Sequence, residues 1–290
     1  MKSYRLGLTL PLALCSLLLC SCGQPEPETE TIRELNELPI EQLRLFLKGY
    51  PGDWRSDQAQ LQAGPEPLDE KPAAPEAIRI PLPSPEAQKN SALSLAAAIA
   101  NRRSVREFSD ASLSLEELSF LLWATQGVTG VQHDDAGKVV KRYRAAPSGG
   151  ARYPLETYLV IHRVEDVPAG LYRYLPSTHE LVCVREDNAL LEPFQQACFG
   201  MPTVGDSAVL FIWAAVPYRT EWKYGYISHR MIAMEAGHVC QNLYLAVTSS
   251  GLGCCAILSY HQPTIDQLIG IDGEDEFAIY MACVGKLKSN

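Results

Sequence analysis

The chain has 290 residues, which allows one or two domains with a sizeable buried core. Its residues are 47% hydrophobic and 20% charged, so the composition is that of a globular protein and excludes disorder of the whole chain. The formal net charge of -9 argues against nucleic acid as a partner.

The N-terminus has the pattern of a secretory leader. Lys2 and Arg5 precede the apolar run 6–19, which is too short for an ordinary membrane span. The run ends in Leu-Cys-Ser-Cys-Gly, which resembles the lipobox of bacterial lipoproteins, where the chain is cut before a cysteine that then receives lipid. We therefore predict a signal peptide over residues 1–21 and lipidation of Cys22. The protein is then exported and anchored at the periplasmic side of the cell envelope, and the Gly after Cys22 slightly favours the outer membrane.

Residues 22–77 are rich in Pro, Glu and Gln, a composition that buries too little apolar surface to fold alone. We predict an acidic tether here, with one candidate helix at residues 40–47, where apolar residues recur at helical spacing. The folded domain is expected to occupy residues 78–290.

Six cysteines remain in the body of the chain, and most of them lie in apolar runs, where Cys behaves as a small buried hydrophobe. None of them forms a C-x-x-C pair, so neither a zinc knuckle nor a thioredoxin-like motif is indicated, and the disulfide state stays open. The six are Cys183, Cys198, Cys240, Cys254, Cys255 and Cys283.

Helical and strand-like patterns mix along the domain and predict an α+β protein. Ser114 and Glu117 form a capping box, and the run 208–216 is continuously apolar, as in a central strand that is buried on both faces. Residues 128–144 mix Gly, Asp and Lys and are predicted to form a loop. The predicted helices are 91–101, 114–127, 190–199 and 235–250, and the predicted strands are 157–162, 171–174, 180–184, 208–216, 256–258 and 278–284.

Three arginines and a hydroxyl lie within five residues: Arg102, Arg103, Ser104 and Arg106, with Val105 between them. Guanidinium groups keep their charge and match the geometry of a phosphate dianion. Because the run follows a predicted helix, a turn there can spread several side chains around one anion. The alternative is that the basic residues only complement the dipole of the helix end.

The stretch Gly251, Leu252, Gly253 begins a match to the G-x-G-x-x-A dinucleotide fingerprint. That fingerprint must follow a strand and open a helix, whereas here a helix is predicted before it and a strand after it. The glycines are better interpreted as a helix stop whose backbone allows close approach of a flat ligand.

Two further patterns carry chemical groups. Glu235 and His238 are spaced as in di-iron bundles, but the second copy that such sites need is missing, so we predict no metal site and a packing or hydrogen-bonding role for His238. Residues 218–226 form an aromatic and basic loop after the central strand, in which Lys223 and Tyr224 are candidates for proton transfer. A surface loop or a dimer contact is the alternative for this stretch.

Six motifs follow one another along the chain: R-R-S-V-R, L-L-W-A-x-Q-G, A-P-S-G-G-A-R-Y-P, K-Y-G, E-A-G-H-x-x-Q-N-L and G-L-G. In this order they resemble the nitroreductase family, specifically its SagB-type dehydrogenase branch. The resemblance covers about residues 78–288. It implies an α+β nitroreductase-like fold with a mostly antiparallel central sheet flanked by helices, a homodimer, and FMN bound at the subunit interface.

By the same resemblance, each motif receives a role. The flavin phosphate would be held by Arg102, Arg103, Ser104, Arg106 and Lys286. The flavin ring would be lined by Pro147, Ser148, Gly149, Gly251, Leu252 and Gly253. Lys223 and Tyr224 match the pair used in proton removal by azoline oxidases.

The resemblance implies an FMN-dependent oxidoreductase that passes hydride through flavin N5, with NADH or NADPH as transient donor and a small molecule or peptide as substrate. One alternative is a thiazoline or oxazoline dehydrogenase that acts on a modified peptide. The other is a lipid-anchored flavin-binding protein without catalysis.

Overall fold

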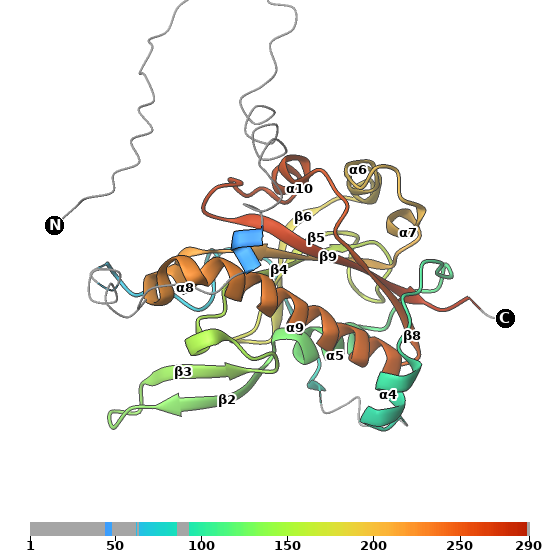
Figure 1. Cartoon of the computed structure of the whole chain (residues 1–290). Helices are drawn as coiled ribbons and strands as arrows, with labels where there is room; N and C mark the ends of the chain where they lie inside the picture. Colours follow the sequence, from blue (N-terminus) through green and yellow to red (C-terminus); the bar gives the residue numbers. More distant parts are fainter. Residues whose placement is uncertain (1–43, 48–61, 63, 86–92, 289–290) are drawn as a thin grey trace, which may run out of the picture. The chain divides into compact units, whose positions relative to one another are not determined.

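A computed structural model of the chain describes residues 44–47, 62, 64–85 and 93–288 (Figure 1). The predicted leader, with Cys22, lies outside these residues and stays a prediction. The chain divides into two compact units, residues 1–48 and 49–290. In the first unit only the 3-10 turn η1 (Arg44–Leu47) is described, and the rest of the account concerns the second unit. Within the described ranges, no helix has the length and apolar character needed to cross a bilayer.

A seven-stranded sheet forms the centre of the second unit, and every neighbouring pair in it is antiparallel. The central strand β7 is buried at every residue, which confirms the prediction from its apolar run. In spatial order the strands are β1 (Arg79–Pro81), β6 (Glu180–Glu186), β5 (Gly170–Leu175), β4 (Leu155–Ile161), β7 (Val209–Ala215), β9 (Phe277–Lys286) and β8 (Leu252–Ile257).

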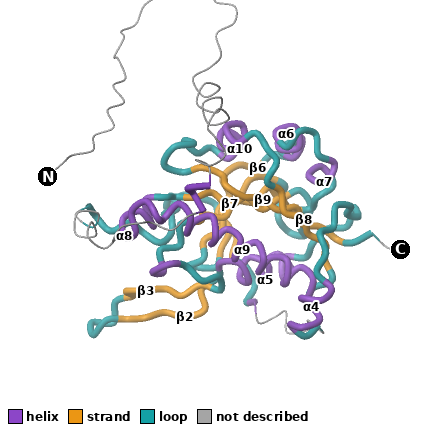
Figure 2. Tube along the Cα trace, viewed as in Figure 1, coloured by secondary structure: helices purple, strands orange, loops and turns teal. Residues whose placement is uncertain are grey.

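Helices cover both faces of the sheet, as Figures 1 and 2 show. Because successive side chains of a strand point to opposite faces, β7 contributes Phe211 and Trp213 to one core and Leu210 and Ile212 to the other. The first core is closed by α5 (Leu115–Gln126) and α9 (Ser228–Ser249), with α4 (Leu95–Asn101) packed on α9. The second is closed by α6 (Leu191–Ala197), α7 (Pro202–Gly205) and α10 (Gln262–Ile269). The antiparallel α+β fold expected from the resemblance is confirmed.

The prediction of a loop at residues 128–144 is wrong. The segment forms a hairpin of β2 (Val128–His133) and β3 (Val139–Arg144), which pair with each other outside the main sheet. Its turn is closed by Asp134, whose Oδ1 accepts the amides of Ala136 at 3.0 Å and Lys138 at 2.8 Å. Most of its residues are exposed or half-buried, so the apolar alternation that marks a strand is weak here.

The predicted loop after β7 is also wrong, because residues 218–224 form the helix α8 (Tyr218–Tyr224). Pro217, which precedes the first helical residue, already has helical dihedrals, and Gly225 ends the helix with a φ of 55°. After a 3-10 turn, η5 (Gly225–Ile227), α9 begins at Ser228, seven residues before the predicted start at Glu235. Because aromatic and charged side chains alternate in this stretch, its sequence shows no clear repeat of apolar residues at helical spacing.

Part of the segment predicted as a tether is hydrogen-bonded to the domain, although it lies before residue 78. We call Gly64–Pro72 the strap. Arg144 donates to the carbonyl oxygen of Asp69 at 2.5 Å, Arg152 to that of Pro67 at 3.1 Å, and Arg173 to that of Lys71 at 2.6 Å. These bonds satisfy backbone groups of an extended segment that has no strand partner of its own.

A buried carboxylate, Glu156 on β4, ties the strap to the sheet. Only 2% of its side chain is exposed, and it accepts hydrogen bonds from the guanidinium groups of Arg173 at 3.1 Å and Arg219. It also accepts the backbone amide of Lys71 at 2.7 Å. One carboxylate thus joins β4, β5, α8 and the strap, and its two cations are themselves buried.

Replacement of Glu156 by Ala is expected to destabilise the fold by about 3–5 kcal/mol, because it leaves two buried guanidinium groups without a counter-charge. Urea unfolding of the purified domain measures this. The control is Glu180→Ala, which breaks the exposed ion pair with Arg79 at 3.2 Å and should cost less than about 1 kcal/mol. Equal losses in the two variants would contradict the role given to Glu156.

Candidate functional site

The arginine run lies along the outer edge of β8. The amide of Val105 donates to the carbonyl of Cys254 at 2.8 Å, and the amide of Ser109 donates to that of Lys286 at 2.9 Å. Phe108 forms a bridge with Leu287. The sheet therefore brings the run, the Gly251–Gly253 turn and Lys286 to one place, although they are far apart in the sequence.

A tyrosine from α9 organises this place. The hydroxyl of Tyr244 lies 2.9 Å from Ser104 Oγ and accepts the amide of Ala256 at 2.9 Å. The guanidinium of Arg102 lies over the same ring, 5.2 Å from its centroid. Tyr244 thereby fixes the arginine run against β8, and the motif analysis did not single it out.

The three arginines differ in their bonding. Arg103 turns back onto the end of α4, where it donates to the carbonyls of Ala100 at 3.0 Å and Arg102 at 2.7 Å. Arg106 is exposed, and burial raises the pKa of the Cys255 thiol, an effect that the charge of Arg106 partly offsets. Within the described part of the chain, no carboxylate forms an ion pair with Arg102, Arg103 or Arg106. Their guanidinium groups are therefore available to bind an anion.

Lys286 does have a carboxylate partner. Its ammonium is 2.5 Å from Glu117 Oε1, and the other oxygen of Glu117 accepts the amide of Ser114 at 2.8 Å, as the predicted capping box requires. The ammonium can bind a phosphate only by exchanging this carboxylate. The phosphate role of Lys286 stays a prediction.

The Gly251–Gly253 turn confirms the interpretation as a helix stop. α9 ends just before Gly251, which has a φ of 69°, and β8 follows it, so the fingerprint of a dinucleotide-binding unit is excluded by context. A Cβ on Gly253 would come within 3.0 Å of Val105, Phe108 and Leu287. The close approach at Gly253 is thus made by the chain's own arginine run.

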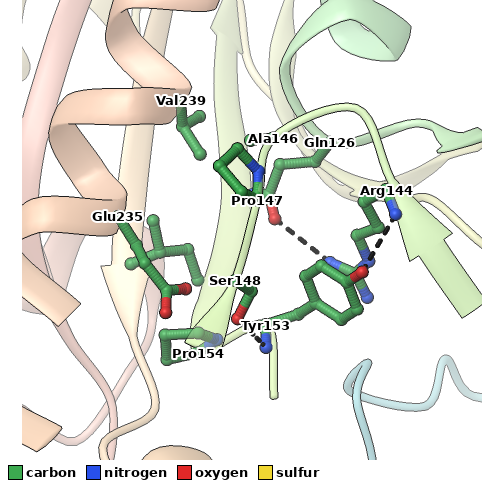
Figure 3. A pocket seen from close by; sticks show the side chains of 10 residues that line it. Gln126, Arg144, Ala146, Pro147, Ser148, Tyr153, Pro154, Glu235 and Val239 are labelled. Atoms are coloured by element: carbon green, nitrogen blue, oxygen red, sulfur yellow. Dashed lines mark hydrogen bonds between the residues drawn. The ribbon is translucent and has the colours of Figure 1, made fainter. Parts of the chain in front are cut away.

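A second group of predicted residues surrounds the turn between β3 and β4. Gly149, in η4 (Gly149–Ala151), donates its amide to Glu235 Oε1 at 2.8 Å, and Ser148 Oγ accepts the amide of Tyr153 at 2.9 Å. Figure 3 shows Ser148 and Glu235 lining the same pocket, with Pro147 beside them. Pro147 is exposed and the two residues after it are half-buried, so this turn is accessible.

Lys223 and Tyr224 belong to this second group. They end α8 against Gly150, where an added Cβ would lie 2.5 Å from Tyr224 Oη and 3.1 Å from Lys223 Nζ. The ammonium of Lys223 is 5.6 Å from the centroid of the Tyr224 ring. Burial raises the pKa of Tyr224, partly offset by Arg152, so its phenol remains protonated and can donate a proton or a hydrogen bond.

The predicted site residues therefore form two groups on one helix. Tyr244 holds the first and Glu235 the second, nine residues apart on α9, which corresponds to about 13–14 Å along the helix axis. Glu235 carried a signal in the sequence, since it is a charged residue beside the apolar positions of that helix. In the structure it is only 6% exposed. Within the described residues, no cluster of three or more His, Cys, Asp or Glu side chains is arranged to hold a metal ion.

Comparisons with known proteins agree on one family. A family model described as the nitroreductase family matches residues 99–286. A Methanocaldococcus jannaschii protein named as a nitroreductase is 35% identical over 185 residues, which cover 64% of this chain and 87% of that protein. A crystal structure from Ralstonia eutropha, of a protein assigned to the nitroreductases, has 27% identity and a TM-score of 0.58, covering 76% of this chain and 97% of that one.

The microcin B17-processing protein McbC of Escherichia coli is 31% identical over 135 residues. These residues cover 43% of this chain and 46% of McbC, so the chain spans less than half the length of that relative.

Replacement of Glu235 by Gln is expected to remove a pH-dependent loss of stability. Burial raises the pKa of Glu235, against the opposing bonds from Gly149 and Ser148. The folded state thus holds this proton more tightly than the unfolded state, and wild type loses stability relative to the variant as pH rises from the ordinary carboxyl value through the raised one. Melting temperatures of both proteins between about pH 4 and about pH 8 measure the difference. A difference in melting temperature, variant minus wild type, that stays constant or falls as pH rises would contradict this.

Proposed function

Because the chain belongs to the nitroreductase family, we propose that it is an FMN-dependent oxidoreductase. The observation that carries the proposal is the first group, where Arg102 and Arg106 stand beside Ser104 with no carboxylate partner among the described residues. When bound, the flavin would supply the redox chemistry, by hydride transfer at N5. The protein would supply position, charge and proton donors.

The donor set fits a phosphate. Guanidinium groups bind phosphate oxygens in pairs, and the Ser104 hydroxyl adds a further donor. Arg102 is held in place by the Tyr244 ring, so little side-chain freedom remains to be lost on binding. Lys286 would join this set by leaving Glu117, whose other oxygen accepts the amide of the N-cap residue Ser114.

The second group would hold the flavin ring. Pro147, Ser148 and Gly149 offer an accessible turn, and Glu235 fixes its conformation by accepting the amide of Gly149. Gly251 and Leu252 would offer backbone near the first group, whereas Gly253 is covered by the arginine run.

We propose a homodimer, with the flavin at its interface. α4 exposes Leu95 and Ile99, which are 67% and 56% accessible, next to an apolar groove that Phe120 and Trp123 help to line. A second copy of the chain would bury this surface. Such pairing would also place residues of two chains around each flavin.

A second candidate function is azoline oxidation on a modified peptide. It is favoured by the similarity to the microcin B17-processing protein and by the position of Lys223 and Tyr224 beside the turn of the second group. In both functions NADH or NADPH would act as a transient partner of the flavin. A flavin carrier without catalysis would instead bind FMN and show no useful reduction by either nucleotide.

The proposal includes lipid attachment at Cys22, which membrane fractionation of the Cys22→Ser protein would test.

Replacement of Arg106 by Ala is expected to weaken FMN binding at least about tenfold, because a hydrogen bond to a charged group contributes about 1.5–3 kcal/mol. Its unfolding midpoint should change little, since the side chain is exposed. Flavin fluorescence titration of the leaderless protein gives the dissociation constant. Arg185→Ala, which removes an exposed arginine on β6, is the matched control and should bind FMN as wild type does. A colourless protein that cannot be reconstituted with FMN would refute the proposal.

Replacement of Lys223 by Ala is expected to lower turnover about 10²–10⁴-fold, the range of a general acid or base, while FMN stays bound. Tyr224→Phe removes the neighbouring hydroxyl and should act in the same direction. Arg185→Ala, which removes an exposed arginine on β6, is the control. Steady-state rates with nitroaromatic and azoline substrates, compared with the flavin absorbance of each variant, separate catalysis from binding. Unchanged rates in Lys223→Ala would remove this residue from the mechanism.

A further inference from the structure

A second cavity, of about 660 Å³, lies between the strap, the hairpin strand β3 and the end of α8. Its volume is within the range of small-molecule sites. The lining residues that matter below are Glu66, Leu68 and Asp69 of the strap, Lys138, Lys141 and Arg142 of the hairpin, and Arg152, Trp222 and Lys223.

The cavity is basic, although the chain as a whole is acidic. It is lined by five basic and two acidic side chains, whereas the chain carries a net charge of -9. The two acidic groups are neutralised, because Asp69 pairs with Arg142 at 3.4 Å and Glu66 pairs with Arg152 at 2.5 Å. What remains is an excess of positive charge.

Three ammonium groups carry this excess: those of Lys138, Lys141 and Lys223. Within the described ranges, none of them has a carboxylate at ion-pair distance, and Lys141 instead lies 5.3 Å from the centroid of the Tyr143 ring. Low-dielectric walls around charges of one sign concentrate their field and attract the opposite charge. The cavity is therefore suited to an organic anion.

Part of the cavity wall, which includes Leu68 and Trp222, is apolar, and the indole of Trp222 is held in place. Trp222 lies under the guanidinium of Arg152, 5.0 Å from it, and donates its indole N–H to the carbonyl of Gly64 at 3.0 Å. Arg152 is fixed in turn by the carbonyls of Pro67 and Arg219, at 3.1 and 2.9 Å. With Leu68 on the strap, these groups form a rigid surface for the body of a ligand.

The cavity adjoins the second group of site residues. Lys223 and Gly150 line it, and the same Gly150 packs against Tyr224. One wall is the strap, which lies before residue 99, where the match to the family begins.

We propose that this cavity binds a carboxylate-bearing organic substrate. Its carboxylate lies among Lys138, Lys141 and Lys223, and its apolar body lies against Trp222 and Leu68. The inference rests on the proposed function, because it names the substrate class of that same site.

The experiment is calorimetric titration of the FMN-loaded, leaderless protein with 4-nitrobenzoate and with its neutral amide, 4-nitrobenzamide. The acid is expected to bind about tenfold more tightly than the amide, which corresponds to about 1.4 kcal/mol. In the double variant Lys138→Gln, Lys141→Gln this preference should fall to about twofold or less. Lys288→Gln, which removes an exposed ammonium outside the cavity, should leave the preference unchanged.

Equal affinities for acid and amide in wild type, or a preference that survives in the double variant, would overturn the inference. Binding needs no turnover, so the outcomes for the two proposals separate. If the double variant loses the preference, but the wild-type protein binds FMN that neither NADH nor NADPH reduces, the proposed activity is refuted and the anion site stands. A normal rate of nitro reduction without any preference for the acid over the amide would refute the anion site and leave the proposed activity standing.

Discussion

The buried carboxylate of Glu156 is the interaction on which the rest of the site depends. Two guanidinium groups and one backbone amide converge on it from β5, α8 and the strap. Because α8 ends in Lys223 and Tyr224, and the strap forms a wall of the basic cavity, the same ion cluster positions both sides of the proposed substrate site. Buried charges of this kind are stable only when every partner is present.

The long helix α9 links the two halves of the candidate cofactor site. Its Tyr244 fixes the arginine run against β8, and its Glu235 holds the Gly149 turn. A rigid helix keeps the spacing of these two contacts constant, whereas loops would let it vary. The residues that carry the proposed chemistry are thus set by one element whose own side chains do little of that chemistry.

Local signals were sufficient for much of the fold. The apolar run of β7, the capping box at Ser114 and the stop at Gly251 each follow from neighbours in the sequence, and the structure agrees with all three. The hairpin was missed because its exposed polar side chains blur the alternation of a strand, and α8 was missed because its aromatic and charged side chains, most of them buried or half-buried, show no clear helical period. The bonding of the strap was missed for another reason: its carbonyls are satisfied by arginines about 70 to 100 positions away, a pairing that no local pattern encodes. The grouping of the site residues on α9 had the same non-local origin.

The position of the arginine run has a consequence for the solubility of the protein. Strands at the border of a sheet offer unpaired amides and carbonyls on which further chains can stack into aggregates. Here Val105 already bonds to Cys254 along β8, and at the opposite border β1 is only three residues long and ends in Pro81, which has no amide hydrogen to offer. The segment proposed to bind the flavin phosphate therefore also shields one border of the sheet, so a substitution that loosened it would promote aggregation as well as weaken the proposed binding.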